Sequence, residues 1–441
     1  MDKTIEKIVS LCKRRGFIFQ SSEIYGGFSA VYDYGPLGVE LKNNLSQLWW
    51  KEMTQNHENI VGLDSGILMH PKIWEASGHV GAFNDPLVDC KRCKSRFRAD
   101  EVVEDIDNQD WASVQCPSCG AIGSLTEPRQ FNLMFKTNVG PVEETGTEAF
   151  LRPETAQGIY VNYQLVQGSM RLKVPFGIAQ IGKAFRNEII ARNFIFRTRE
   201  FEQMEMQYFV KPGTDDNSMI EWKNKRMKFY EDRLNINKSN LQFHEHGDNE
   251  LAHYAKEAWD IEYKFPFGWS EIEGVHNRTD FDLARHSEYS GKNLSYFDQP
   301  NNDRFIPYII ETSAGLNRML LTVLADSYWE DNENNRTVMR FHPRLAPIKA
   351  VVCPLTKKDG LPEKARMIIE LLKPHFKVVF DQQGSIGKRY YRQDEAGTPY
   401  GITVDHKSLE DDTVTLRNRD TQRQDRISID RLVEELIKKV L

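Results

Sequence analysis

The sequence predicts an α+β N-terminal domain, residues 1–345, followed by a C-terminal α/β domain, residues 346–441. The first observation is a strand, a polar loop and a strand over residues 175–210. The second is the segment of residues 305–328, which begins as an apolar strand and continues as a helix. Third, prolines interrupt the pattern near residues 342–348, and strands then alternate with helices.

Length and composition set limits on the function. The chain has 441 residues, enough for two or three domains. Its net charge of -6 excludes a protein that binds nucleic acid through overall positive charge, but a local basic face remains possible. No apolar run approaches the roughly 20 residues of a membrane span, and charges interrupt the N-terminus. We therefore expect a cytoplasmic protein with no membrane partner.

The N-terminal domain contains two predicted helices and two predicted insertions. Ile5, Ile8 and Cys12 recur at helical spacing, and apolar residues over 39–53 predict a second helix that Gly35-Pro36 begins. Residues of about 84–130 read as a small inserted module. Residues of about 211–250 are charged and rich in asparagine, and we expect a helical insertion there.

The C-terminal domain reads as alternating elements. The predicted strands are KAVVCPL, KVVFD, YGITVD and TVTLRN. A helix starting at Pro362 follows the first strand, and the chain ends in a helix with Leu432, Leu436 and Val440 on one face. The alternation favours a compact α/β domain.

The cysteines indicate a metal site. Four of the six form two Cys-x-x-Cys pairs, which are Cys90, Cys93, Cys116 and Cys119. In a long chain without a secretory signal, paired spacing favours metal binding over disulfides, and four thiolates make a closed structural zinc site. Two redox dithiols are the alternative. Cys12 and Cys353 lie in apolar patterns and are predicted core thiols.

Residues 185–205 have the composition of a nucleotide-binding hairpin. In a strand, Arg186 and Glu188 would point the same way, and the returning strand would put Phe201, Gln203 and Glu205 on one face. The loop between them carries Arg192, Arg197 and Arg199. Arginine suits phosphate, an aromatic ring suits a purine face and a carboxylate suits its amine. A solvated hairpin with paired charges is the alternative.

Residues 307–324 predict a second binding corner. An apolar strand is expected to end at Glu311, small residues follow, and Arg318 lies in the first turn of a helix. A helix N-terminus attracts anions, so this arrangement suits a phosphate. An ordinary strand, turn and helix capped by Ser or Thr is the alternative.

An ordered set of segments resembles the homodimeric glycyl-tRNA synthetases, which are class II aminoacyl-tRNA synthetases. The segments are SSEIYGGFSAVYDYGPLG (21–38), LRPETAQGIY (151–160), FRTREFEQME (196–205), EIEGVHNRTDFDL (271–283), IETSAGLNR (310–318) and KRYYRQDEAGTPYGITVD (388–405). The resemblance implies a catalytic domain with an antiparallel sheet flanked by helices, then an anticodon-binding domain. It implies that glycine and ATP form glycyl-adenylate, and that glycine then passes to the 3′-terminal adenosine of tRNA.

The resemblance also implies an ATP site that uses Mg2+. Arg186 would hold the α-phosphate, Glu188 the adenine amine and Glu271 a magnesium ion, while Phe201 and Arg318 would stack on either side of adenine. Arg186 and Arg318 would be the catalytic residues. The implied ATP-binding set is Arg186, Asn187, Glu188, Phe196, Arg197, Thr198, Arg199, Glu200, Phe201, Glu271, Ile272, Gly315 and Arg318.

The implied glycine site is rich in carboxylates, which suit an ammonium group. Arg278 would pair with the glycine carboxylate, and a small pocket would exclude larger amino acids. The implied set is Arg98, Glu154, Phe201, Gln203, Glu205, Arg278, Glu311, Ser313 and Gly315. Structural roles are the alternatives: Arg152 as the ion-pair partner of Glu154, Ser313 as a helix cap, and Asp280 or Asp282 as the partner of Arg278.

Further expectations concern partners. Pro71 resembles the end of the class II dimer motif, which would put the helix over 39–53 at a homodimer interface. We expect tRNA contacts from basic and aromatic clusters in the C-terminal domain: Lys388, Arg389, Tyr390, Tyr391, Arg392, Arg417, Arg419, Arg423 and Arg426. His244 and His246 are interpreted as solvated, and His253 as a packed residue.

Two other functions stay open. One is another class II synthetase of the same subclass, of the threonyl, prolyl or histidyl type. The other is a catalytically inactive accessory subunit that binds nucleic acid, although such a chain should have lost Arg186, Glu188 or Arg318, and all three are present.

Overall fold

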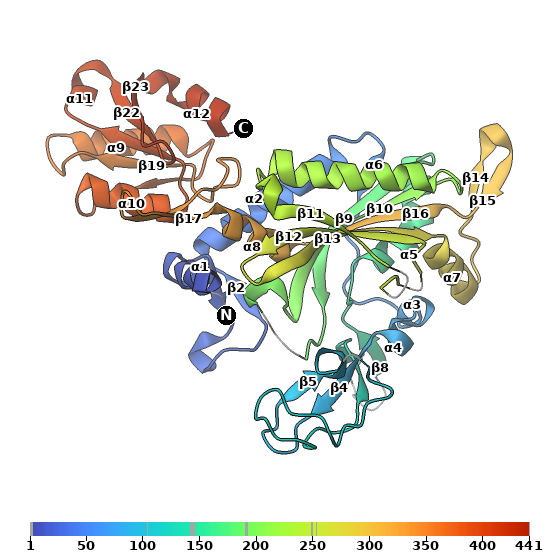
Figure 1. Cartoon of the computed structure of the whole chain (residues 1–441). Helices are drawn as coiled ribbons and strands as arrows, with labels where there is room; N and C mark the ends of the chain where they lie inside the picture. The colour runs from blue at the N-terminus through green and yellow to red at the C-terminus, as the bar shows by residue number, and fades with distance from the viewer. Residues whose placement is uncertain are drawn as a thin grey trace.

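A seven-stranded sheet forms the centre of the N-terminal part of this computed structural model, which describes residues 3–103, 105–141, 146–189, 193–247, 250–252 and 254–440 (Figure 1). The strands lie in the order β11 (Leu241–Glu245), β12 (Glu257–Phe265), β13 (Gly268–Thr279), β16 (Tyr308–Gly315), β10 (Glu200–Val210), β9 (Phe176–Phe185) and β3 (Ile60–Gly62). Neighbours are antiparallel except β3 and β9. No helix of the described residues is long and apolar enough to cross a membrane.

Helices cover the two faces of this sheet unequally. One face packs against α2 (Pro36–Thr54), α6 (Asp215–Lys228) and α8 (Leu316–Ser327), α1 (Lys3–Arg15) packs against α8, and together they enclose the largest core. The other face carries α5 (Ala156–Met170) and α7 (Phe281–Ser290) toward one end only. Figure 1 shows α6 on one side of the strands and α7 on the other. The second face is therefore open over the middle strands.

Strand alternation decides which side chains reach the open face. Along β10, Met204 and Met206 enter the large core, while Gln203 and Glu205 point the other way. β10 pairs with β16 so that Glu205 lies opposite Ser313. The sequence-based end of this strand at Glu311 is wrong, because pairing with β10 and β13 continues the strand to Gly315.

The two predicted N-terminal helices are confirmed. α1 buries Ile5, Ile8 and Cys12 completely. α2 begins at Pro36, whose missing N–H costs nothing in a first helical turn.

The helical prediction for residues 211–250 is wrong in part. α6 and a π-helical turn, Phe229–Arg233, agree with it. Residues Leu241–Glu245, however, form β11, the edge strand of the large sheet, which pairs with β12. Leu241 and Phe243 pack against the core, whereas Gln242 between them is exposed, which is the alternation of a strand.

The cysteine-containing segment forms a separate small unit below the large sheet in Figure 1. Its sheet consists of β4 (Asn84–Asp89), β5 (Arg96–Arg98) and β6 (Arg129–Asn132). Val88 and Trp111 pack with the cysteines in a core of its own. Short elements complete the N-terminal part: β1 (Ile18–Gln20), β2 (Tyr32–Tyr34), α3 (Lys72–Ala76), α4 (His79–Ala82), β7 (Lys136–Val139), β8 (Thr147–Phe150), β14 (Tyr296–Asp298), β15 (Asp303–Phe305), β17 (Tyr328–Asp331) and β18 (Arg336–Met339).

The C-terminal part contains a five-stranded sheet with its own core. Its order is β20 (Val378–Phe380), β19 (Ala350–Pro354), β21 (Tyr400–Val404), β22 (Thr413–Asn418) and β23 (Gln424–Ser428). Its helices are α9 (Leu361–Leu372), α10 (Ile386–Ala396), α11 (Lys407–Asp411) and α12 (Leu432–Val440). The sequence analysis missed α10, α11 and β23. The four predicted strands and the two predicted helices are present.

The basic clusters expected in this part are corrected for three arginines, because Arg389, Arg417 and Arg419 are buried. Arg389 donates to the carbonyl of Pro354 at 2.5 Å. Arg419 donates to the carbonyl oxygens of Phe341 and Gly397. Tyr390 is also buried, on the inner face of α10, whereas Tyr391 is 43% exposed. Side chains buried in this way are unavailable to a nucleic acid.

A buried ion-pair network joins the C-terminal sheet to the N-terminal part. Asp394 of α10 accepts from Arg417 of β22 at 2.8 Å and from Arg336 of β18 at 2.5 Å. Arg336 also pairs with Asp331 at 2.8 Å. The side chains of these four residues are at most 5% exposed. Breaking such a pair leaves an uncompensated buried charge, so the two parts are held together firmly.

Candidate active site

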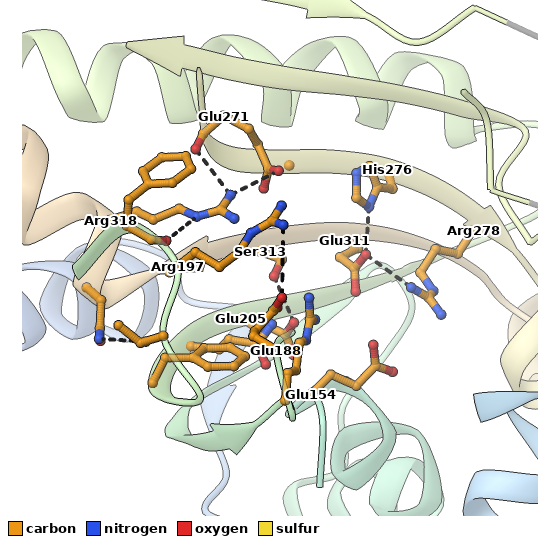
Figure 2. A pocket seen from close by; sticks show the side chains of 18 of the residues that line it. Glu154, Glu188, Arg197, Glu205, Glu271, His276, Arg278, Glu311, Ser313 and Arg318 are labelled. Carbon is orange, nitrogen blue, oxygen red and sulfur yellow. Dashed lines mark hydrogen bonds and ion pairs between the residues drawn. The ribbon is translucent and has the colours of Figure 1, made fainter. Parts of the chain in front are cut away.

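A cleft lies on the open face of the large sheet, across β10, β13 and β16 (Figure 2). Fifteen residues named from the sequence line it: Glu154, Arg186, Glu188, Phe196, Arg197, Thr198, Phe201, Gln203, Glu205, Glu271, Arg278, Glu311, Ser313, Gly315 and Arg318. The structure therefore brings most of the two predicted sets into one place. One end is rich in arginines and aromatic rings, and the other is rich in buried carboxylates.

Arg186 lies at the basic end. Residues 186–188 follow β9 instead of extending it, so the predicted strand position is wrong, although both Arg186 and Glu188 face the cleft. The guanidinium carbon of Arg186 lies 5.3 Å from the ring centres of Phe83 and of Phe201. Its Nε donates to the carbonyl of Pro153 at 3.1 Å. Arg186 is thus oriented by two rings and a carbonyl.

Glu188 lies next to two cations. Burial raises the pKa of the Glu188 carboxyl, and this effect outweighs the opposing effect of Arg197 and Arg186. The nearest Arg197 nitrogen is 4.0 Å from the carboxylate. A half-desolvated carboxylate of this kind accepts hydrogen bonds strongly.

Arg318 occupies the first turn of α8 and crosses the cleft to Glu271 (Figure 2). Its Nη1 is 3.0 Å from Glu271 Oε2, and Arg318 holds the pKa of that carboxyl below its usual value. The guanidinium lies 4.4 Å from the ring centre of Phe196. Between the Arg186–Phe201 pair and the Arg318–Phe196 pair, the cleft has two cation–aromatic walls.

A buried guanidinium organises the acidic end. Arg278 Nε donates to Asp282 Oδ2 at 2.8 Å, and its Nη1 donates to Glu311 Oε2 at 3.2 Å. The guanidinium also stacks on Tyr254 at 3.9 Å. Glu311 further contacts His276 Nδ1 at 2.8 Å. Burial raises the pKa of Glu311, but Arg278 and His276 outweigh it and lower the pKa to about 2.

The carboxyls of the acidic end differ in charge. Burial, with the neighbouring charges of Glu311 and Glu154, raises the pKa of Glu205 to about 8. Its oxygens accept from Thr155 Oγ1 at 2.5 Å and from Ser313 Oγ at 2.8 Å. Burial opposes ionisation of Glu154 too, but His79 and Arg278 outweigh it and lower the Glu154 pKa. Near neutral pH, Glu154 and Glu311 are charged and Glu205 is protonated.

Of the structural roles considered as alternatives for the glycine-site residues, only the pairing of Arg278 with Asp282 is present. Arg152 does not pair with Glu154; it donates to the carbonyls of Lys183 and Ser65. Ser313 is a strand residue and not a helix cap. Arg278 does pair with Asp282, and its guanidinium still lines the cleft.

Five predicted site residues do not line the cleft. Ile272 is fully buried in the large core, so its side chain is unavailable to a ligand. Arg199 donates to the carbonyl of Glu188, and Glu200 pairs with Lys183. The backbone N–H of Asn187 donates to the carbonyl of Leu133, and Arg98 is paired with Asp85 and Asp100. Arg192 and His253 lie outside the described residues.

Sequence reasoning missed Tyr254, Gly274, His276 and Asn317, which also line the cleft. Gly274 and His276 lie in the segment 271–283 and Asn317 in the segment 310–318, but single positions within these segments carry no pattern that points to a site. His246 was interpreted as solvated, which is wrong, because it contacts Asp260 Oδ2 at 2.8 Å and is only 21% exposed.

The four paired cysteines converge. The Sγ atoms of Cys90, Cys93, Cys116 and Cys119 all lie within 4.8 Å of one another. Cys90 to Cys119 and Cys93 to Cys116 each measure 3.8 Å. A tetrahedral zinc with Zn–S bonds of about 2.3 Å needs sulfurs about 3.8 Å apart, so the donor set fits this ion. Cys12 and Cys353 are buried in the cores, as predicted.

Comparison with known proteins agrees with this geometry. Residues 135–327 match the model of the tRNA synthetase class II core domain (G, H, P, S and T), and residues 349–439 match that of the anticodon binding domain. A glycine–tRNA ligase of Treponema denticola is 60% identical over 98% of this chain and 96% of its own length. Those of Borrelia hermsii and Thermobifida fusca are 56% and 52% identical, over 97% and 99% of this chain and 96% and 98% of their own lengths.

The antiparallel sheet, its open-face cleft and the two matching domain models define a class II tRNA synthetase. Within that class, the full-length identities are with one group of enzymes. The chain belongs to the glycine–tRNA ligase family.

The raised pKa of Glu205 should make stability depend on pH. The folded chain keeps this proton up to about pH 8, whereas the unfolded chain releases it near the ordinary glutamate pKa of about 4.3. Because the folded state then binds more protons, the free energy of unfolding falls as pH rises between these values and levels off above them. We expect Glu205→Gln to reduce this fall, measured by urea unfolding between about pH 5 and about pH 8.

Glu245→Gln on the exposed edge strand β11 is the matched control and should leave the pH dependence unchanged. An unchanged pH dependence in Glu205→Gln would contradict the assignment.

Proposed function

We propose that this chain attaches glycine to tRNA in two steps, through a glycyl-adenylate intermediate. The observation that carries the proposal is the division of one cleft into a basic, aromatic end and an acidic end. Glycyl-adenylate has the complementary parts: a purine and a phosphate at one end, and a small ammonium group at the other.

The basic end would hold ATP. Adenine would lie between Phe201 and Arg318, with its amine toward Glu188, and Arg186 would contact the α-phosphate. The rings of Phe201 and Phe196, each paired with an arginine, support this placement. Glu271 would contact the Mg2+ that accompanies ATP, and a carboxylate oxygen is a ligand that this ion prefers.

The acidic end would hold glycine. With Glu154 and Glu311 charged and Arg278 already paired to Asp282, this end attracts an ammonium group. Ser313 and Glu205 would add hydrogen bonds. Arg278 is the buried cation that would pair with the glycine carboxylate. Its guanidinium would then contact both this carboxylate and Glu311.

Catalysis would depend on orientation and charge stabilisation. The glycine carboxylate attacks the α-phosphorus, pyrophosphate leaves, and no protein nucleophile is needed. Arg186 and Arg318 would stabilise the charge that develops on the phosphate oxygens, because both are fixed in advance by rings and carbonyls.

We expect the purified chain to catalyse pyrophosphate–ATP exchange that depends on glycine and on Mg2+. Arg318→Ala should lower the glycine-dependent rate by about 10²–10³-fold, the usual effect of removing one preorganised charge from a transition state. The rate would be measured with each of the twenty amino acids in turn.

Arg304→Ala, on the exposed β14–β15 hairpin away from the cleft, is the matched control and should exchange normally. Exchange with threonine, proline or histidine instead of glycine would overturn the acidic-end assignment. Absence of both exchange and ATP binding would favour an inactive accessory subunit.

Residues 346–441 would bind the anticodon region, and residues 1–345 would form the catalytic domain. The C-terminal domain carries 18 lysines and arginines against 15 acidic residues, so local contacts must supply its affinity. Of the predicted clusters, Lys388, Tyr391, Arg423 and Arg426 remain exposed and are the candidates, although Arg426 also pairs with Asp405. A cytoplasmic location would follow from this function.

We propose a structural zinc at the four cysteines. It would fix the turns of the inserted module, whose strand β5 carries Arg98. The matching sulfur separations support a single ion over two redox dithiols.

The purified protein should contain about one zinc per chain, measured by plasma mass spectrometry. Cys93→Ser should lower the zinc content and the thermal stability, because a structural zinc contributes directly to folding. Cys353→Ala, in the C-terminal core, is the control and should keep the metal. Full zinc content in Cys93→Ser would contradict a four-cysteine site.

We also propose a homodimer. β3 is an edge strand of the large sheet, and Leu68, shortly before Pro71, is 53% exposed. Sedimentation equilibrium should give about twice the 51.2 kDa of one chain, and a mass of 51.2 kDa would contradict the dimer.

A further inference from the structure

The loop between β1 and β2, residues 21–31, presents large apolar side chains to solvent. Ile24 is 89% exposed, Tyr25 87% and Phe28 57%. Three such residues within five positions are unusual, because a clustered apolar surface normally marks an interaction site.

The backbone of this loop is well ordered. Phe28 N–H donates to the Ser21 carbonyl at 2.9 Å, and Ser21 N–H donates to the Val31 carbonyl at 3.1 Å. Ser22 and Ala30 both have positive φ angles, near 60°. Such conformations persist only where the surroundings enforce them. The backbone that carries the exposed side chains therefore has a defined conformation.

The loop is also tied to the basic end of the cleft. Arg199 N–H donates to the carbonyl of Ala30 at 2.8 Å, and its Nη1 donates to that of Ser29 at 3.1 Å. The Nε of the same arginine donates to the carbonyl of Glu188 at 3.2 Å. Glu188 lines the cleft, so one arginine side chain connects the loop to the nucleotide site.

We propose that this loop binds the unpaired 3′ end of tRNA, with Tyr25 and Phe28 stacking on its bases. The inference rests on the proposed function, because transfer of glycine requires the 3′-terminal adenosine to enter this cleft. Unpaired nucleotides are commonly bound by aromatic rings, which stack on the bases, beside arginines, which contact the phosphates.

The charge around the loop favours RNA over a second copy of this chain. Arg186 and Arg197 line the cleft and Arg199 lies between it and the loop, and these arginines suit a phosphate backbone. A second copy offers surfaces of mixed sign, with 58 basic and 64 acidic residues in the chain, whereas an RNA strand offers one negative phosphate per nucleotide.

The test compares two reactions of the full-length protein. The double variant Tyr25→Ala, Phe28→Ala should exchange pyrophosphate with glycine at the wild-type rate, because that step uses no tRNA. Its kcat/KM for charging a glycine-accepting tRNA should fall about tenfold or more, as expected for lost base stacking. Phe28→Trp, which keeps a stacking ring, should retain most charging.

Binding of a shortened tRNA makes the test specific. With a tRNA that lacks its unpaired 3′ nucleotides, the double variant and the wild type should bind equally. Ile220→Ala, an exposed apolar residue of α6, is the matched control and should change neither reaction.

Unchanged charging by the double variant would overturn the inference. Weaker binding of the shortened tRNA by the double variant than by the wild type would also overturn it. A lower sedimentation mass for the double variant would assign the loop to a dimer interface instead. Failure of the proposed function would be recognised separately, as absence of glycine-dependent exchange in the wild type.

Discussion

The pairing of Arg278 with two buried carboxylates is the interaction on which the acidic end depends. Arg278 lies on β13, Asp282 on α7 and Glu311 on β16, so one guanidinium joins three elements. Without it, both carboxylates would be left as uncompensated charges away from water. Burial raises the pKa of the neighbouring Glu205, and the charges of Glu311 and Glu154 raise it further. The result is a small pocket with excess negative charge, arranged around one buried guanidinium.

The basic end is organised differently, by rings. Arg186 and Arg318 each lie against an aromatic face and donate to a carbonyl, so both are oriented before any ligand arrives. A ring and a carbonyl do not neutralise a guanidinium, so Arg186 keeps its charge for a phosphate, whereas Arg318 is also paired with Glu271. A ligand with an anion at one end and a cation at the other would match the two ends only in one direction. The cleft thus has a built-in polarity.

Local patterns in the sequence predicted part of this arrangement well. Alternation placed Phe201, Gln203 and Glu205 on one strand face, and Pro36 marked the start of α2. Cysteine spacing predicted the four-sulfur cluster. The failures have a common origin in long-range contacts. β11 exists because β12 is available to pair with it, and His276 enters the cleft because it lies opposite Glu311 in the register of β13 and β16. The burial of Arg389, Arg417 and Arg419 likewise depends on partners distant in the chain, which charge counting does not identify.

The buried network around Asp394 has a consequence for how a long substrate would fit the protein. Arg336 and Arg417 approach the same carboxylate from the two parts of the chain, and Arg14 and Arg15 of α1 pair with the adjacent Glu395. The C-terminal sheet is therefore fixed against the N-terminal part and is not connected to it by a flexible linker alone. The distance between the outer surface of the C-terminal sheet and the cleft is fixed in the free protein. Changing it would require several buried ion pairs to break. An RNA that contacts both the C-terminal sheet and the cleft would have to match this fixed distance. Its overall length and bend would therefore affect binding before any base is recognised.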